Sequence, residues 1–314
     1  KILPSYLRKT KAIEDLVPWL YLKGISTGEM PDALVHLGFD GSGLSPTSVT
    51  RMTEVWRDEY GDWNKRDLSG KRYVYIWVDG IYFGCRLSDD RPCVLVVMGA
   101  TAEGKKELIA MSDGQRESET SWTAILLDLK NRGMIEPPKL ATGDGSLGFW
   151  LALAKVFPQT RHQRCWVHKT ANVLDKLPKN QQPQAKSMIH EVWMSATRKD
   201  AIKAFDRFIE VYGTKWPRTK DCLEKDRAEL LAFYDFPAEH WGHLRTSNPI
   251  ESTFATVRLR TYRTKGPGSR EAGLAMAFKL ARKAESRWRK LNGSEKLQDL
   301  IDDVVFVDGN RIAA

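Results

Sequence analysis

The sequence predicts a mixed α/β fold, in which a sheet packed against helices follows a helical segment and is interrupted by a helical insertion. Three observations predict it. Runs of β-branched and aromatic residues cluster between residues 70 and 168, segments with helical spacing alternate with the later runs, and residues 169–245 contain no convincing strand. Three strands followed by alternating helix and strand are typical of a mixed sheet with helices against it.

The composition supports a globular chain with about two domains' worth of residues. It has 314 residues, of which 42% are hydrophobic and 28% charged, a balance that excludes a largely disordered or fibrous protein. The longest apolar run, residues 93–100, is far shorter than the roughly 20 residues of a membrane span. No signal peptide opens the sequence. The four cysteines are scattered along the sequence: Cys85, Cys93, Cys165 and Cys222. Both observations predict a reducing, cytoplasmic setting away from membranes.

Residues 1–69 are predicted to be helical. Residues 13–21 and 29–37 have short amphipathic patterns. Ser45 suits an N-cap and Pro46 the first helical position, so a third helix is expected to follow and to run to about residue 60.

The second and third of these helices resemble a helix-turn-helix, in which the second helix reads the major groove of DNA. The connection over residues 38–45 is longer than the usual tight turn, and an ordinary helical subdomain fits the same pattern. A helix-turn-helix would present three side chains to DNA: Thr47, Ser48 and Arg51.

Residues 70–168 are predicted to form the first part of the sheet domain. Its first two strands are separated by Asp79-Gly80, a common hairpin dipeptide. The expected order is strands 73–78, 81–83 and 93–98, helix 119–131, strand 139–142, helix 147–156 and strand 161–167. In the first helix Ser118 or Ser121 is expected to cap and Trp122 to be buried.

Residues 169–245 are predicted to be a helical insertion, with helices near 171–177, 184–197, 200–212 and 221–234. A helix of the sheet domain is expected over residues 246–265, and a basic helical segment over residues 266–314.

The net charge of +9 is concentrated in one segment. Residues 252–292 hold eleven of the 49 Lys and Arg and two of the 40 acids, so that 38 bases and 38 acids remain elsewhere. Such a segment predicts a polyanionic partner at one surface, and a solvated helix face is the plain alternative. Its first helix carries Arg258, Arg260, Arg263 and, just beyond, Lys265.

A second basic helix is expected over residues 271–291. Leu274, Phe278, Ala281, Trp288 and Leu291 recur at near-helical spacing and predict its buried face. Lys279, Arg282, Lys283 and Arg287 would then face mostly outward, toward DNA.

Three carboxylates stand where phosphodiester chemistry would need them. Asp79 ends an apolar strand, Asp144 follows another strand between two glycines, and Glu251 opens a helix. Carboxylates that converge from separate elements can hold a pair of Mg²⁺ ions, which stabilise the attacking and leaving oxygens. Arg258 lies seven residues after Glu251, on the same helical face, where a cation could hold a phosphate.

Each acid also has a plain explanation. Asp-Gly is a common turn and occurs five times in this sequence. With Asn248 as N-cap and Pro249 at the first position, Glu251 would occupy the capping-box position. Arg258 can be an ordinary surface residue.

Four longer motifs resemble the Mutator-like family of bacterial insertion-sequence transposases. They are Tyr75-Ile76-Trp77-Val78-Asp79-Gly80-Ile81-Tyr82-Phe83, Gly143-Asp144-Gly145-Ser146-Leu147-Gly148-Phe149-Trp150, Gln163-Arg164-Cys165-Trp166-Val167-His168-Lys169 and Arg245-Thr246-Ser247-Asn248-Pro249-Ile250-Glu251-Ser252-Thr253-Phe254. The resemblance extends from about residue 2 to residue 290.

The resemblance implies a ribonuclease-H-like core of the DDE type, with Asp79, Asp144 and Glu251 as the metal-binding catalytic triad. Mg²⁺, or Mn²⁺ in its place, would be the cofactor. The implied reaction nicks DNA at terminal inverted repeats and joins the freed 3′-hydroxyl to target DNA, and a homodimer is expected on the DNA. Family members also carry further N-terminal sequence, so part of the repeat-binding region is expected to be missing here.

The Cys165-x-x-His168 pair belongs to the same family pattern. A zinc site would need four ligands, and only His162 is nearby in sequence, so a structural role or a place near the DNA end is the preferred interpretation. Two other functions stay open: a non-catalytic DNA-binding relative, and a ribonuclease-H-like nuclease that cleaves without strand transfer.

Overall fold

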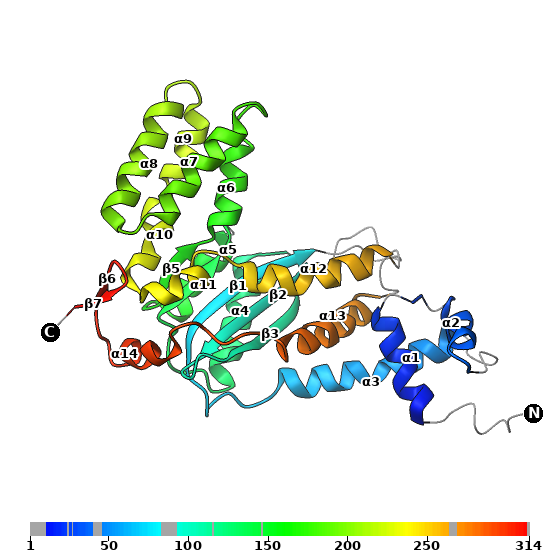
Figure 1. Ribbon diagram of the computed structural model, residues 1–314. Coiled ribbons are helices and arrows are strands. Elements are labelled where there is room, and N and C mark those ends of the chain that lie inside the picture. Colours follow the sequence, from blue (N-terminus) through cyan, green and yellow to red (C-terminus); the bar gives the residue numbers. More distant parts are fainter. Residues whose placement is uncertain are drawn as a thin grey trace, which may run out of the picture.

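A five-stranded mixed sheet organises the molecule (Figure 1). The computed structural model describes residues 11–23, 25–26, 28–39, 46–82, 93–114, 116–145, 147–263 and 269–312. The strand order is β3-β2-β1-β4-β5. The first three strands are antiparallel neighbours, and the last two run parallel to β1: β1 (Tyr73–Tyr82), β2 (Cys93–Thr101), β3 (Lys106–Gly114), β4 (Leu140–Gly143) and β5 (Arg161–Arg164).

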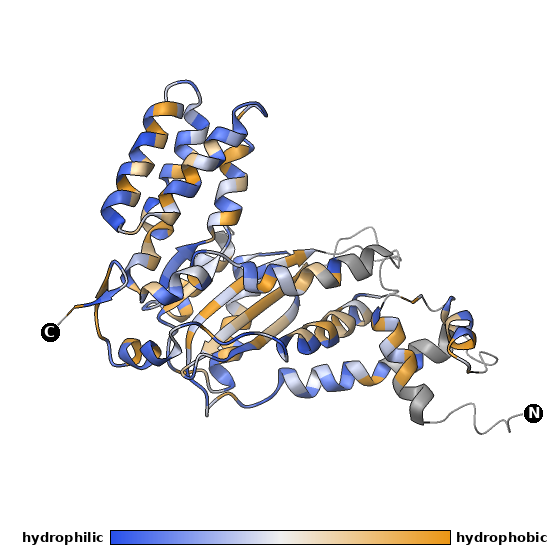
Figure 2. Cartoon of the chain, viewed as in Figure 1, coloured by the Kyte–Doolittle hydropathy of each residue, from blue (hydrophilic) through white to orange (hydrophobic). Residues whose placement is uncertain are grey.

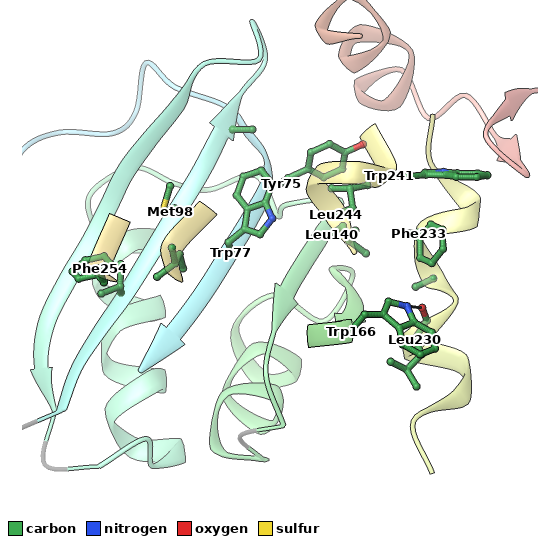
Figure 3. Packing of buried hydrophobic residues seen from close by; sticks show 14 of the residues in the cluster. Tyr75, Trp77, Met98, Leu140, Trp166, Leu230, Phe233, Trp241, Leu244 and Phe254 are labelled. Carbon is green, nitrogen blue, oxygen red and sulfur yellow. Dashed lines mark hydrogen bonds between the residues drawn. The ribbon is translucent and has the colours of Figure 1, made fainter. Parts of the chain in front are cut away.

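Helices cover both faces of this sheet. On one face α4 (Glu119–Asn131) and α5 (Leu147–Val156) pack together, with Trp122 and Phe149 edge to face at 5.1 Å between ring centroids. The other face lies under α12 (Asn248–Arg263) and α13 (Arg270–Glu285), and Figure 3 shows Trp77 and Met98 of the sheet beside Phe254 of α12. Because both faces are covered, every residue of β2 is buried, and the strand is a continuous apolar run.

The helical insertion stands away from the sheet (Figure 1). No residue between 169 and 245, all of which are described, lies in a strand, as predicted. The returning chain passes through short helical turns η2 (Ala232–Asp235), η3 (Ala238–His240) and α11 (Trp241–Leu244). The insertion itself consists of α6 (Trp166–Leu174), α7 (Gln182–Met194), α8 (Arg198–Tyr212), α9 (Pro217–Glu224) and α10 (Arg227–Leu230).

The N-terminal helices lie at the opposite end of the molecule from the insertion (Figure 1). They are α1 (Lys11–Lys23), α2 (Met30–His36) and α3 (Pro46–Asn64). Trp63 of α3 packs on Phe278 of α13, with ring centroids 5.0 Å apart. All three predicted helices are therefore present, while the predicted cap Ser45 lies outside the described residues.

The C-terminal part returns to the sheet domain. It contains η4 (Ser294–Lys296), α14 (Leu297–Ile301) and the two-stranded ribbon of β6 (Phe306–Val307) and β7 (Asn310–Arg311). In Figure 2 the strands of the central sheet are largely hydrophobic, whereas the helices mix hydrophobic and hydrophilic residues. None of the described helices has the length and apolar character to cross a membrane.

The helix caps follow local sequence. Ser118 accepts a hydrogen bond from the Ser121 backbone N–H at 3.1 Å and caps α4, and Trp122 in its first turn is buried, as predicted. Thr197 caps α8 in the same way, and Ser269 caps α13 through the Ala272 N–H. Each hydroxyl satisfies a backbone donor that would otherwise have no partner.

The predicted hairpin at Asp79-Gly80 is wrong. β1 continues through both residues, which pair with Val96 and Leu95 of β2, and the strand ends at Tyr82. The actual third strand, Lys106–Gly114, was not predicted, because it begins with two charged residues. Lys106 and Glu107 are nevertheless buried, and Glu107 pairs with Lys71.

Three predicted boundaries also shift. The last strand ends at Arg164 rather than residue 167, because the Trp166 N–H bonds to the Arg245 carbonyl and α6 begins there. The predicted helix 221–234 is broken into α9, α10 and η2. The second basic helix ends at Glu285, and the Leu291 N–H bonds instead to the Gly104 carbonyl.

A buried ion cluster fastens the insertion to the end of β5. Lys169 of α6 is 1% exposed and donates to the Asp226 carboxylate and to the Cys222 carbonyl. Arg164, 6% exposed, donates from Nε to the same carboxylate at 3.1 Å. One carboxylate therefore compensates two buried cations. Removing it would leave both without their partner, which costs far more than losing a surface pair.

We predict that Asp226→Asn lowers the free energy of unfolding by about 3 kcal/mol, because two buried cations lose their counter-charge. The matched control is Asp206→Asn, which breaks the exposed pair with Arg227 and should cost about 0–1 kcal/mol. Urea unfolding followed by circular dichroism measures both. Equal losses in the two variants would contradict the buried-cluster interpretation.

Candidate active site

Two of the predicted acids are brought together by strand register. β1 and β4 are parallel, with Tyr75 opposite Leu140 and Trp77 opposite Thr142. Two residues further along both chains, this register leads to Asp79 and Asp144. Since neighbouring strands lie about 4.8 Å apart, the two carboxylates share one edge of the sheet. That edge is the carboxyl end of β4, where open α/β sheets place their ligands.

The loop that carries Asp144 is held from two sides. The indole Nε1 of Trp150 donates to the Asp144 carbonyl at 2.9 Å. The guanidinium of Arg164 covers Gly145 so closely that a Cβ there would lie 2.5 Å from its Nη2 atom. Because Arg164 is itself held by Asp226, the ion cluster of the insertion also supports the acidic loop.

Glu251 enters the site from the first turn of α12. The Ser247 carbonyl accepts from the N–H groups of Ile250 and Glu251, so Ser247 is the residue that precedes the helix and Asn248 is its first residue. The predicted capping-box position is therefore wrong by one residue. The Glu251 carboxylate instead lies 3.4 Å from the Ser247 hydroxyl and 3.4 Å from Nε2 of His168.

A fourth acid, Glu117, belongs to the same site and was not singled out from the sequence. Its side chain lies over Gly80, next to Asp79 in β1: a Cβ at Gly80 would come within 2.2 Å of its Oε1. Recognising β3 would have revealed it. β3 runs parallel to β1, so Glu117, three residues after β3 ends, lies at the same sheet edge as the two aspartates.

Burial and the neighbouring acids raise the cost of ionising Asp79. Burial raises the pKa of Asp79 to about 7, and the negative charges of Asp144, Glu117 and Glu251 add to this effect. The nearby His168 cation acts in the opposite direction. A half-buried group of carboxylates of this kind favours a bound cation, because a cation removes the repulsion between them.

Cys165 and His168 join the first turn of α6 to the first turn of α12. The N–H and the hydroxyl of Ser247 both donate to the Cys165 sulfur at 3.3 Å, and the same hydroxyl lies 3.4 Å from Nδ1 of His168. The hydrogen bond to Cys165 raises the pKa of His168 to about 9, against the opposing effect of burial. A charged imidazolium therefore lies beside the Glu251 carboxylate.

Three side chains of this site offer possible metal-ligand atoms close together. Ligand atoms of Cys165, His168 and Glu251 lie within 4.8 Å of one another. His162, the fourth zinc ligand considered from the sequence, instead packs on Trp150 at 4.7 Å between ring centroids. The Cys165 sulfur already accepts from Ser247. Carboxylate oxygens, such as those of Glu251, are the ligands that Mg²⁺ prefers, whereas sulfur and imidazole are not.

Much of the charge on α13 is paired within the protein. Lys279 pairs with Glu59 of α3, and Arg282 pairs with Glu285 of its own helix. The Lys283 ammonium lies 5.5 Å from the centre of the Trp19 ring. These contacts bind α13 to its neighbours and reduce the charge that it offers to an outside polyanion.

The remaining predicted DNA contacts fall into two groups. Arg51, Arg258 and Arg287 are exposed. Lys265 and the side chains of Thr47, Ser48, Arg260 and Arg263 lie outside the described part of the chain.

Lys106 was not predicted as a site residue, yet it lies close to Glu251. It is 8% exposed, and its Nζ atom lies 3.1 Å from Nδ1 of His243. Burial and the Lys106 charge together lower the pKa of His243 to about 4. Both residues line the same groove as Glu251.

Comparison with known proteins places this site in a family. The family model described as "Transposase, Mutator family" matches residues 1–290, which include all three predicted acids. The chain belongs to the Mutator family of transposases.

Two relatives of this Mutator-family chain are about half identical to it over most of their length. A transposase for insertion sequence element IST2 of Acidithiobacillus ferrooxidans is 51% identical over 89% of this chain and 95% of the relative. One for insertion sequence element IS6120 of Mycolicibacterium smegmatis is 50% identical over 95% and 92%. A solved structure of the simian T-cell lymphotropic virus intasome in complex with PP2A regulatory subunit B56 gamma contains a chain that is 13% identical to this one. The match covers 67% of this chain and 65% of that one, with a TM-score of 0.22, and a TM-score this low carries no argument about the fold.

For this Mutator-family protein we predict that Lys106→Met raises the pKa of His243 part of the way from about 4 toward 6.5, because burial remains while the adjacent cation is lost. The wild-type contribution of His243 to stability is present above pH 6.5 and is lost as pH falls toward 4, since the folded protein disfavours the charged ring. NMR titration of the six histidines measures the shift.

The control is Lys105→Met, which removes the same charge one residue away, where Lys105 pairs with Glu107. It should leave the His243 titration unchanged. An unaltered pKa of His243 in Lys106→Met would show that Lys106 does not act on this ring.

Proposed function

We propose that this chain is a DDE transposase that nicks DNA at the terminal inverted repeats of an insertion sequence and transfers the 3′-hydroxyl end into target DNA. The observation that carries the proposal is that parallel strand register brings Asp79 and Asp144 to one edge of the sheet and that the charges of Asp144 and Glu251 act on Asp79, in a chain of a transposase family. The relatives named above are transposases for insertion sequence elements.

The element order supports a ribonuclease-H-like core for this proposal. Three antiparallel strands precede two parallel strands that alternate with helices. The helical insertion lies between the second aspartate and the glutamate, as the family resemblance implies.

The donor chemistry of the site fits Mg²⁺, with Mn²⁺ as a substitute, held by Asp79, Asp144 and Glu251. When bound, such ions supply charge stabilisation for both oxygens of a phosphodiester displacement. The raised pKa of Asp79 supports this assignment, because close carboxylates need a compensating cation to be ionised together.

The protein's own side chains hold these acids in place. Trp150 and Arg164 fix the loop of Asp144. Ser247 and His168 contact the Glu251 carboxylate, and the His168 cation can keep Glu251 in the site before DNA or metal arrives. We interpret Cys165 and His168 as positioning residues for Glu251.

The proposed reaction has two displacements at phosphorus. In the first, a water oxygen bonds to the phosphorus at the element end, the bond to the 3′ oxygen breaks, and that oxygen leaves as a 3′-hydroxyl after taking up a proton. In the second, the 3′-hydroxyl loses its proton and bonds to a phosphorus of the target strand, whose own 3′ oxygen leaves. No covalent bond between protein and DNA forms. Joining two element ends to one target would require two protomers, so we propose a homodimer on DNA.

We predict that Asp79→Asn, Asp144→Asn and Glu251→Gln each reduce nicking by at least about 10³-fold while leaving DNA affinity within a few fold, since losing electrostatic stabilisation of a transition state has effects on this scale. EDTA should abolish wild-type nicking, and added Mg²⁺ or Mn²⁺ should restore it. The measurement is cleavage of a labelled duplex that carries the element's terminal repeat.

The control is Asp206→Asn, an acid of the insertion that pairs with Arg227 far from the site. Cleavage that survives all three active-site changes would refute the triad. A strand-transfer assay with a pre-cleaved 3′ end tests the second displacement separately: cleavage without joining would indicate a nuclease, and binding without either activity a non-catalytic relative.

A further inference from the structure

A groove of about 680 Å³ opens beside Glu251. It lies on the face of the sheet that α12 covers, since Met98 of β2 and Asn248 of α12 both line it. Four cationic side chains and a single carboxylate, that of Glu251, are among its lining residues. The four cations are Lys106, Arg258, Arg287 and Arg289. We call this site the basic groove.

Hydrogen bonds fix one wall of the basic groove, the segment that follows α13, to neighbouring elements. The indole Nε1 of Trp288, which lies between the two arginines that follow α13, donates to the Thr253 hydroxyl of α12 at 3.1 Å. The Leu291 N–H donates to the Gly104 carbonyl in the turn between β2 and β3 at 2.9 Å. The segment that carries Arg287 and Arg289 is therefore held between α13, where it begins, α12 and the turn between β2 and β3.

Lys106 is the least expected of the four cations, because it is buried. Its ammonium lies 6.0 Å from the centre of the Trp77 ring and beside the neutral ring of His243. Within the described residues no carboxylate pairs with Lys106, Arg287 or Arg289. A buried cation without a counter-charge is costly, and an anion bound in the groove would compensate it.

Other cations of the basic segment are already neutralised. Arg270 makes a two-bond pair with Asp113 at 3.0 and 2.8 Å, and Lys279 pairs with Glu59. Arg282 pairs with Glu285. Within the described part of this segment, these three cations are therefore compensated by carboxylates, whereas Arg287 and Arg289 of the basic groove are not.

We propose that the basic groove seats the sugar-phosphate backbone of the DNA strand whose end is presented to Glu251, with Lys106, Arg287 and Arg289 as phosphate contacts. The inference rests on the proposed function, which it extends to a defined binding surface. Guanidinium and ammonium groups are the side chains that bind phosphate oxygens in this way.

The test compares two double variants that remove the same charge. Arg287→Gln/Arg289→Gln alters the basic groove, and Arg270→Gln/Lys279→Gln alters the paired cations. Each variant is titrated, in buffer with EDTA and no divalent metal, against a fluorescein-labelled 30-base-pair duplex of arbitrary sequence, by anisotropy at several KCl concentrations. Arbitrary sequence is suitable because phosphate contacts do not read bases.

The groove variant should reduce the slope of log affinity against log salt by about 0.9 for each lost contact, or roughly 1.8 in total. The paired-cation variant should change it by less than about 0.5, because those charges are already compensated. An unchanged slope in the groove variant would overturn the proposal, and so would an equal reduction in both variants, which would mean that only net charge matters.

Lys106 is tested separately. Lys106→Met should reduce the slope by about 0.9 and Lys106→Arg should retain the wild-type slope. If both substitutions reduce affinity without altering the slope, Lys106 is a packing residue and its part of the proposal fails.

Cleavage is not involved in these titrations, so the two proposals fail in different ways. A reduced slope in a protein whose triad variants still nick DNA supports the groove and refutes the triad. An unchanged slope in a protein whose triad variants lose nicking refutes the groove alone. A wild-type protein that does not bind the duplex refutes both.

Discussion

The mutual repulsion of carboxylates at one edge of the sheet is the constraint on which the rest of the structure depends. Asp79 has a pKa of about 7 because it is buried near Asp144, Glu117 and Glu251. Such a group is unfavourable unless the surrounding fold holds it together and supplies positive charge. One positive group beside these acids is His168, whose own pKa is raised to about 9. Further out, Lys106, Arg287 and Arg289 line the basic groove beside Glu251.

The helical insertion is connected to this site at both of its ends. Where it begins, Cys165 and His168 contact Ser247, and where it returns, Ser247 precedes the helix that carries Glu251. The half-buried Asp226 holds Arg164, which in turn covers the loop of Asp144. Asp144 and Glu251 therefore each have a structural link to the insertion, although neither lies within it. If the insertion moved when DNA binds, Asp144 and Glu251 would be displaced together.

The long helices and the three candidate acids could be predicted from local sequence patterns, whereas the pairing of strands could not. The helices over residues 119–131 and 147–156 match their predicted bounds, because apolar spacing, and in the first of them the Ser118 cap, are local properties. The hairpin at Asp79-Gly80 was wrong because Asp-Gly is equally compatible with extended backbone once β2 pairs with it. β3 was missed because its charged start is stabilised by distant residues, Lys71 and Tyr73, that local sequence does not connect with Glu107.

The sequence by itself determined the fold class, the family motifs, the three acids and the excess of positive charge near the end of the chain. Only the tertiary structure decided which charges remain available. Lys279 and Arg270 meet Glu59 and Asp113, which lie 220 and 157 residues away, while Lys106 joins Arg287 and Arg289 beside Glu251. The physical reason is that charge is a property of each residue, whereas its compensation depends on neighbours that strand pairing and helix packing bring together.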